Sequence, residues 1–240
     1  MLQADPLAPQ GLRLQPLDQF AGSLGQRVYQ TLRAAILSLA YRPGEIMRKP
    51  EVCDQLGVSR SPVADAVARL AAEGLVDVIP QAGTFVARFS MAEIREGAFL
   101  REAIEVAAIE RVAPSITDAQ LQLLRRNLVV QAALVTDGDT AGFYAQDGAM
   151  HEMLLSFTGF RKLAMVSDTA WLHVHRARVL ILPMPGRVAA TLAEHRAIMA
   201  ALEARDAVKA KTAVQVHLRQ LLTYLEPLER DRPEFFSVKA

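Results

Sequence analysis

One stretch of the sequence, from Gly57 to Gly74, constrains the fold more than any other. Gly57 can adopt the left-handed turn conformation that residues with a Cβ resist, and the Ser59 hydroxyl is expected to cap the helix that follows. Pro62 falls in the first helical turn, where its missing N–H costs little. Apolar residues then recur at helical spacing until Gly74, which should close the helix; they are Val63, Val67 and Leu70. The stretch predicts a tight turn and a helix with an exposed N-terminus.

The exposed end of this helix carries three donor-rich side chains, Ser59, Arg60 and Ser61. A helix that presents such an end is well suited to enter the major groove of DNA. The charge of the region supports this only weakly, because residues 27–88 hold eight lysines and arginines against six aspartates and glutamates. The hypothesis of DNA binding therefore depends on the elements around the helix.

Those elements follow the order of a winged helix-turn-helix. An amphipathic helix ends at a breaker cluster around Pro43–Gly44, and a short helix runs from about residue 50 to 56. After Gly74, residues 75–79 and 84–87 read as two strands around a turn, which predicts a β-hairpin. The expected N-terminal unit is therefore three helices and a wing.

Composition limits the class of protein. The 240 residues suffice for two modest domains, and 51% apolar with only 6% aromatic residues favours a mostly helical chain. A single cysteine, Cys53, argues against a disulfide scaffold and fits a reducing compartment. Residues 1–20 lack the apolar core of a signal peptide, and no stretch reaches the roughly 20 apolar residues of a membrane span. We therefore expect a cytoplasmic protein.

The run RPGEIMRKPEVCDQLGVSRSPVADAVARLAAEGLVDVIPQAGTFV resembles the DNA-binding domain of GntR-type transcriptional regulators, from about residue 23 to 88. The resemblance implies that the helix end and the wing contact an operator. Ala64 stands where the family usually has arginine, and a lost base contact is worth about 1–3 kcal/mol. Arg48–Lys49 replace the usual Ser-Glu, and we expect them to supply some of the lost phosphate attraction. The predicted DNA-binding residues are Arg48, Lys49, Ser59, Arg60, Ser61, Gln81, Gly83 and Thr84.

From Met91 onward the pattern is entirely helical. Thr117 and Gln120 form a capping box, and further breaks near Asp139 and Asp206 bring the expected number of helices to six, one of them running from about 163 to 182. This half resembles the smaller, VanR-like version of the FCD effector domain found in FadR-type GntR regulators. The predicted fold is mainly α, with a flexible arm (1–22), a winged helix-turn-helix domain (23–89), an all-helical FCD-type domain (90–226) and a loosely held polar tail (227–240).

Four side chains of this half have the spacing of a metal site. Asp147 and His151 are four residues apart on one predicted helix, so they lie on one face. His195 and His217 flank the break at Asp206, and a chain folded back there brings both histidines level. One carboxylate and three imidazoles facing one core can bind a divalent metal ion. Spacing alone leaves a surface hydrogen bond between Asp147 and His151 as the alternative.

The resemblance to FCD domains favours the metal site, because those domains carry D-x3-H, then E-H-x2-I, then a final histidine. All four positions match at Asp147, His151, His195 and His217, and zinc or nickel is the expected ion.

The resemblance also implies a ligand, because an arginine matching Arg101 helps FCD relatives to bind an effector carboxylate. A guanidinium offers carboxylate a planar, two-point match. The alternative is a surface ion pair of Arg101 with Glu105, four residues away. The predicted effector-binding residues are Arg101, His173 and Arg176.

These features predict a homodimeric, ligand-responsive transcriptional regulator and not an enzyme. It is expected to act as a repressor that binds a palindromic operator, a divalent metal ion and a small organic acid. Two alternatives stay open. The metal ion could be the signal without any organic effector, or a metal-dependent enzyme could be fused to a DNA-binding module, with Glu152 and Glu194 as its only candidate bases near the ligands.

Overall fold

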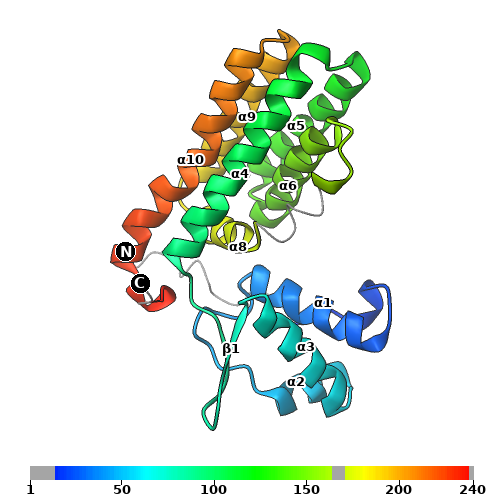
Figure 1. Ribbon diagram of the computed structural model, residues 1–240, viewed down its shortest axis with the longest axis vertical. Coiled ribbons are helices and arrows are strands. Elements are labelled where there is room, and N and C mark those ends of the chain that lie inside the picture. Colours follow the sequence, from blue (N-terminus) through cyan, green and yellow to red (C-terminus); the bar gives the residue numbers. More distant parts are fainter. Residues whose placement is uncertain (1–13, 164–170, 238–240) are drawn as a thin grey trace. The chain divides into compact units, whose positions relative to one another are not determined.

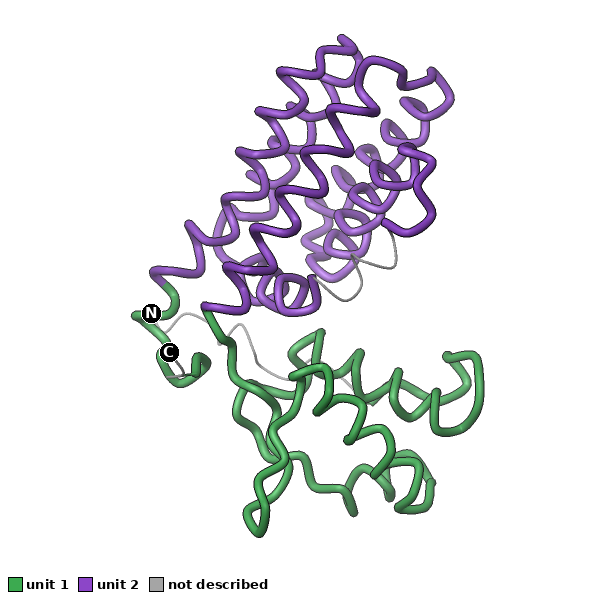
Figure 2. Tube along the Cα trace, viewed as in Figure 1, with its two compact units in different colours: residues 1–91, 228–240 green, residues 92–227 purple. Residues whose placement is uncertain are grey.

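The computed structural model describes residues 14–163 and 171–237. The chain divides into two compact units (Figure 2): residues 1–91 with 228–240 form one, and residues 92–227 form the other. Among the described residues, no helix combines the length and apolar character needed to cross a membrane.

The first unit is a winged helix-turn-helix (Figure 1). After a short 3-10 helix, η1 (Leu17–Gln19), it contains helices α1 (Leu24–Leu37), α2 (Lys49–Leu56) and α3 (Arg60–Ala72). Strands β1 (Val76–Ile79) and β2 (Gly83–Val86) form the antiparallel hairpin, in which Val76 pairs with Val86 and Ile79 with Gly83. The three helices and the wing expected from the sequence are therefore present.

The two ends of α3 agree with the sequence pattern except in one detail. Gly57 ends α2 in the left-handed conformation (φ 63°), and Gly74, just past α3, has φ 71°. Val63, the first residue of the apolar stripe, is fully buried. Ser59 occupies the N-cap position, but its side chain makes no capping hydrogen bond. The expected hydroxyl cap is therefore wrong, and the exposed Ser59 hydroxyl is left for another partner.

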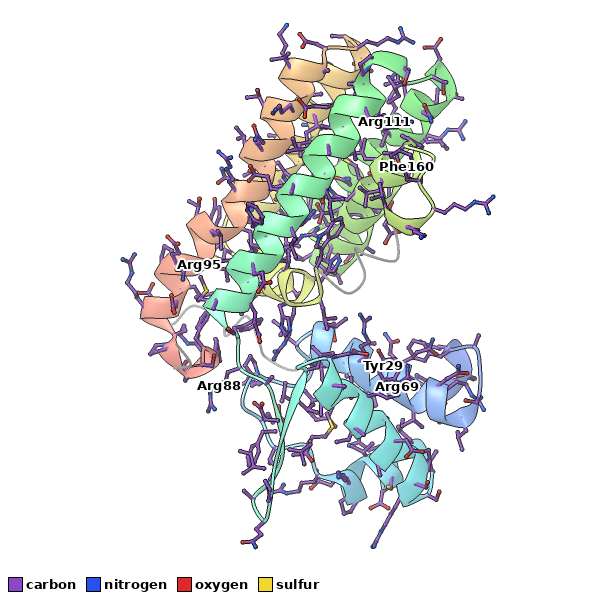
Figure 3. The ribbon with its side chains drawn as sticks, viewed as in Figure 1. Tyr29, Arg69, Arg88, Arg95, Arg111 and Phe160 are labelled. Atoms are coloured by element: carbon purple, nitrogen blue, oxygen red, sulfur yellow. The ribbon has the colours of Figure 1, made fainter. Side chains whose placement is uncertain are left out.

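A polar contact that sequence reasoning missed joins α3 to α1. The Arg69 guanidinium lies 3.7 Å from the centre of the Tyr29 ring, and the Tyr29 hydroxyl donates a hydrogen bond to Glu73. Arg33 approaches the same carboxylate at 3.5 Å. Figure 3 shows Tyr29 and Arg69 together. These contacts supplement the apolar packing of α3 on α1 and help to fix the direction of α3.

The C-terminal segment is more ordered than the sequence suggested. Helix α10 continues through Pro227 to Asp231, and η3 (Pro233–Phe235) follows. Phe236 forms a parallel bridge with Phe89, with ring centres 5.7 Å apart, and both side chains are buried. The expectation of a loosely held tail from residue 227 is therefore wrong for the described part, because two buried phenylalanines anchor it to the first unit.

The second unit is a bundle of helices. Its elements are α4 (Met91–Val112), η2 (Ala113–Ser115), α5 (Asp118–Asp137), α6 (Thr140–Ser156), α8 (Leu172–Ile181), α9 (Arg187–Glu203) and α10 (Ala207–Asp231). Figure 1 shows α4 beside α10, and Arg219 of α10 reaches Glu102 of α4 at 2.6 Å. The apolar core takes side chains from five of the helices, among them Ile109, Leu124, Met150, Ile198 and Val214.

Side-chain caps start several helices of this bundle. The capping box of Thr117 and Gln120 is present, and Asp139 accepts a hydrogen bond from the Gly142 N–H. Asp206 accepts one from the Lys209 N–H, so the chain folds back there as expected. The helix expected over residues 163–182 lies partly outside the described residues; its described part is α8, which begins at Leu172.

Candidate metal and ligand site

The fold brings the four predicted metal ligands together in the core of the second unit. Asp147 and His151 come from α6, His195 from α9 and His217 from α10. One donor atom from each residue lies within 4.8 Å of the others. All four side chains are buried, with 1% exposure for Asp147 and at most 6% for the histidines. The alternative of a surface hydrogen bond is therefore excluded for Asp147 and His151.

The donor atoms that converge are one carboxylate oxygen and three Nε2 atoms. Asp147 Oδ1 lies 3.1 Å from His195 Nε2 and 3.6 Å from His151 Nε2. His151 Nε2 lies 3.1 Å from His217 Nε2. The turn at Asp206 makes this possible, because it reverses the chain between His195 and His217.

The other ring nitrogen of each histidine contacts an oxygen acceptor. His151 Nδ1 lies 2.5 Å from Glu105, His195 Nδ1 lies 2.7 Å from Gln131, and His217 Nδ1 lies 2.7 Å from Glu194. These are a carboxylate, an amide and a carboxylate oxygen, so we assign the ring proton to Nδ1 in all three cases. Each Nε2 then presents a lone pair toward the centre.

This arrangement fits a divalent cation. Asp147 Oδ1 and His195 Nε2 make no hydrogen bond within the described chain although both are buried. With the protons on Nδ1, the 3.1 Å approach of His151 Nε2 to His217 Nε2 sets two lone pairs against each other. A cation between the four donors would bind the two atoms that lack a hydrogen bond and would remove the repulsion between the two lone pairs. Three imidazoles and one carboxylate suit zinc or nickel, and the outer hydrogen bonds are those that commonly orient metal-bound histidines.

Burial keeps the three histidines in the neutral form that metal binding needs. Loss of solvent lowers the pKa of His151, and it lowers the pKa values of His195 and His217 further below the usual range. For His195 and His217, a neighbouring imidazole is the next cause. Glu105 and Arg101 form a buried ion pair beside them (2.6 Å). Burial alone would raise the pKa of Glu105, but the charge of Arg101 helps to bring it well below its usual value.

These shifts predict that the protein is less stable in acid when metal is withheld by a chelator. A histidine whose pKa is lower in the folded state contributes stability above its unfolded pKa, and this is lost as pH falls below about 6.5. The unfolding temperature in chelator should therefore fall steadily from pH 7 to pH 5. Replacing His217 by glutamine should make this slope shallower, whereas an unchanged slope would contradict the shifted pKa of His217.

Three arginines line a small cavity beside the donors: Arg101, Arg178 and Arg187. Arg101 and Arg187 pair with the acids that orient His151 and His217. Arg187 holds Glu194 through two hydrogen bonds, of 2.6 and 2.9 Å. Arg178 contacts the carboxylate of Asp147 itself. The cavity also has apolar walls, from Ile181, Leu182, Leu218 and Leu221.

The predicted effector residues differ in their positions. Arg101 lines the cavity; the alternative pairing with Glu105 is also present, but the pair is buried instead of lying on the surface. His173 is partly exposed and lies 3.7 Å from Glu93, and it does not line the cavity. Arg176 is fully buried on α8 outside the cavity lining, and burial lowers its pKa to about 10. Their effector role stays a prediction.

The outer partners of the histidines were the part of the site that sequence reasoning missed. Gln131 stands 64 residues before His195, and its amide nitrogen donates to Asn127 (2.6 Å), which in turn donates to Gln146 (2.9 Å). Arg187 was not singled out either. Glutamine, asparagine and arginine are common residues, and only the packing of α5 against α6 and α9 brings these to the site.

Replacing Gln131 by leucine should lower zinc affinity by about 10- to 100-fold, because His195 loses the hydrogen bond that orients its ring. The affinity can be measured by competition with a chromophoric chelator. Gln122 is exposed on the same helix, so Gln122→Leu is the matched control. Equal affinities for the two variants would show that the Gln131 contact does not orient the ligand.

The predicted DNA-binding residues gather in the first unit. Ser59, Arg60 and Ser61 are exposed at the start of α3. Arg48 is the N-cap residue of α2 and pairs with Glu51 at 3.4 Å. A groove between the start of α2 and the hairpin is lined by residues that include Arg48, Lys49, Gln81, Gly83 and Thr84.

Within the wing, the three predicted residues are not equivalent. Gln81 is exposed in the hairpin turn with a positive φ of 62°, and Gly83 has φ 133°. The side chain of Thr84 is buried. All three stay predicted DNA contacts; the burial of Thr84 leaves less of its side chain for such a contact than that of Gln81.

Comparison with known proteins agrees with both halves of the fold. Residues 24–86 match the family described as bacterial regulatory proteins, gntR family, and residues 96–220 match the FCD domain. An HTH-type transcriptional regulator in an unstable DNA locus of Streptomyces ambofaciens is 34% identical over 89% of each chain. The protein belongs to the GntR family. This GntR regulator is therefore a transcriptional regulator with an N-terminal DNA-binding domain and a C-terminal FCD domain.

Two further comparisons concern this GntR regulator. The transcriptional repressor RspR of Escherichia coli K12 is 29% identical over 89% of this chain and 94% of its own. The crystal structure of a GntR regulator from Rhodococcus sp. RHA1 superposes with a TM-score of 0.74 over 85% of this chain and 99% of that one. Because that pair is only 23% identical, it supports the fold alone.

Proposed function

We propose that this GntR regulator is a repressor that holds a divalent metal ion in its FCD domain and releases its operator when a small organic acid binds beside the metal. The observation that carries the proposal is the buried set of four donors next to a cavity lined by three arginines. The ion would be held by Asp147, His151, His195 and His217, and it would supply positive charge for an anionic ligand. The name of the relative RspR supports repression.

The proposal includes a homodimer that works in the cytoplasm, where the chromosome is accessible. Two winged domains at a fixed spacing would match a palindromic operator. On α4, an apolar stripe supports self-association: Phe99 is 73% exposed and Leu100 38% exposed, and the exposed Ala103 and Ala107 follow at helical spacing. A second copy would cover this stripe across a two-fold axis.

In the proposed mechanism, the acid shifts a population of conformations. A ligand can favour one arrangement of the domains only if it binds that arrangement more tightly. The acid would select arrangements in which the two α3 helices no longer match the operator spacing. We propose a binding protein and no catalyst, since the two matched families are those of a transcriptional regulator.

The test is operator affinity, measured by fluorescence anisotropy on a palindrome selected from random duplexes. We expect zinc-loaded protein to bind the palindrome, and a panel of organic acids to include one that weakens binding. Release by zinc alone would instead identify a metal sensor. Absence of sequence-specific binding, with and without metal, would overturn the proposal.

A further inference from the structure

Arg178 links the metal ligands to the cavity through one carboxylate. Asp147 Oδ1 faces His195 Nε2 at 3.1 Å, whereas Asp147 Oδ2 contacts the Arg178 guanidinium. Arg178 is almost fully buried and lines the cavity together with Arg101 and Arg187. One side of the Asp147 carboxylate therefore belongs to the donor cluster and the other to the arginines.

The fixed charges around the cavity balance before any ion is added. Three guanidinium groups, of Arg101, Arg178 and Arg187, contact three carboxylates, of Glu105, Asp147 and Glu194. The three histidines are counted as neutral, because each carries its one ring proton on Nδ1, which faces an oxygen acceptor. A divalent ion would leave an excess of two positive charges in a buried region, where charges are weakly screened and costly to leave unpaired.

Arg178 would carry much of this cost. It contacts the carboxylate that would also bind the ion, so two cations share Asp147. Arg101 and Arg187 each hold a separate acid, Glu105 and Glu194. A guanidinium group stays protonated at neutral pH, so Arg178 brings a full positive charge to Asp147.

The size of the cavity also implicates Arg178. Its volume is about 20 Å³, which is room for roughly one water molecule. An organic ligand needs more space, and Arg178 and Asp147 line the cavity side by side and contact each other. A ligand that draws the guanidinium away from Asp147 would both enlarge the cavity and free the carboxylate for the ion.

We propose that Arg178 couples the metal site to the ligand site and that the ligand is a dicarboxylate. Arg178 opposes the metal ion across Asp147. A dianion cancels the two excess charges and takes the guanidinium as its own partner through the planar match of guanidinium and carboxylate. Because coupling between sites is reciprocal, the dianion strengthens metal binding and the metal ion strengthens dianion binding to the same extent. This inference rests on the proposed metal and acid site, and it does not involve DNA.

The test measures zinc affinity of the full-length protein by chelator competition, without added acid, with succinate and with butyrate. Succinate and butyrate have the same number of carbon atoms but differ by one carboxylate. For the wild type we expect succinate to raise zinc affinity about 5- to 150-fold and butyrate to have a much smaller effect. Equal effects of the two acids would overturn the dicarboxylate assignment.

Arg178→Met separates coupling from a structural role. The variant should bind zinc more tightly than the wild type without acid, should bind succinate more weakly, and should lose the succinate effect on zinc. If Arg178 had only a structural role, Arg178→Met would weaken the binding of both zinc and succinate, and that result would overturn the inference. Arg196 is exposed on α9 next to His195, so Arg196→Met is the control and should behave as the wild type.

A second variant covers the case in which Arg178→Met does not fold. Arg178→Lys keeps the charge but loses the planar fork, so zinc affinity should stay near the wild-type value while succinate binding weakens. Unchanged succinate binding would overturn the role of Arg178.

Operator affinity is a separate measurement. If zinc and succinate are coupled but the operator is never released, the proposed function fails and this inference stands.

Discussion

Replacing His217 by alanine should lower zinc affinity by at least about 100-fold, since even outer partners of a metal ligand are worth 10- to 100-fold. His217 supplies one of the four converging donors, and its Nδ1 is held by Glu194. The variant should be purified with little bound metal by elemental analysis. It should also lose the rise in unfolding temperature that zinc gives the wild type, because a ligand selective for the folded state stabilises it by mass action.

The matched control is His173→Ala, because His173 is a partly exposed histidine of the same unit outside the donor cluster. It should keep its metal. The first unit of the His217→Ala variant should stay folded. Nonspecific DNA affinity, which should equal that of the wild type, is the check. Full metal content in His217→Ala would show that these four residues do not form the site.

Replacing Arg60 by alanine should weaken binding to the selected palindrome by about 30-fold or more. A lost base contact costs about 1–3 kcal/mol, and the proposed homodimer would lose two of them. Arg60 is the first residue of α3 and is exposed. It is also the arginine on which base recognition must depend if Ala64, one turn further, supplies no contact. The measurement is anisotropy on the palindrome and on a scrambled duplex of equal length.

Lys49→Ala gives the contrasting pattern. Lys49 begins α2 and lines the groove beside the wing, so we expect it to contact phosphate. Its loss should weaken binding to the palindrome and to the scrambled duplex by the same factor. It should also reduce the slope of log affinity against log salt concentration by about 1 per contact. If Arg60→Ala also weakens binding to both duplexes equally, Arg60 does not contact bases specifically. Arg196→Ala, in the second unit, should leave both affinities unchanged.

The sequence was sufficient for features that depend on local spacing. The apolar stripe of α3, the glycine just past its end and the capping box of Thr117 and Gln120 follow from short-range chemistry, and the structure contains them. Asp147 and His151 share a face because they lie four residues apart on a helix. Even the pairing of His195 with His217 was predictable, because Asp206 marks the turn between them.

Features that depend on packing were not predictable in this way. The partner of His195 is Gln131, from a distant helix, and nothing in its local sequence distinguishes it from other glutamines. The burial of the Arg101–Glu105 pair depends on helices packed around it. Ser59 has a preferred capping residue type and yet makes no cap. The anchoring of the C-terminal segment required knowing that Phe236 meets Phe89.

The burial of the four donors has a consequence for time scales. The donors come from α6, α9 and α10, and none is more than 6% exposed. An ion bound by all four could leave only when these helices separate locally. The rate of this local opening would therefore set how long the ion stays bound. We expect isotopic zinc to exchange much more slowly than an acid leaves the cavity. The metal ion would then stay with each protein molecule from folding onward, and the protein would respond faster to a change in acid concentration than to a change in metal concentration.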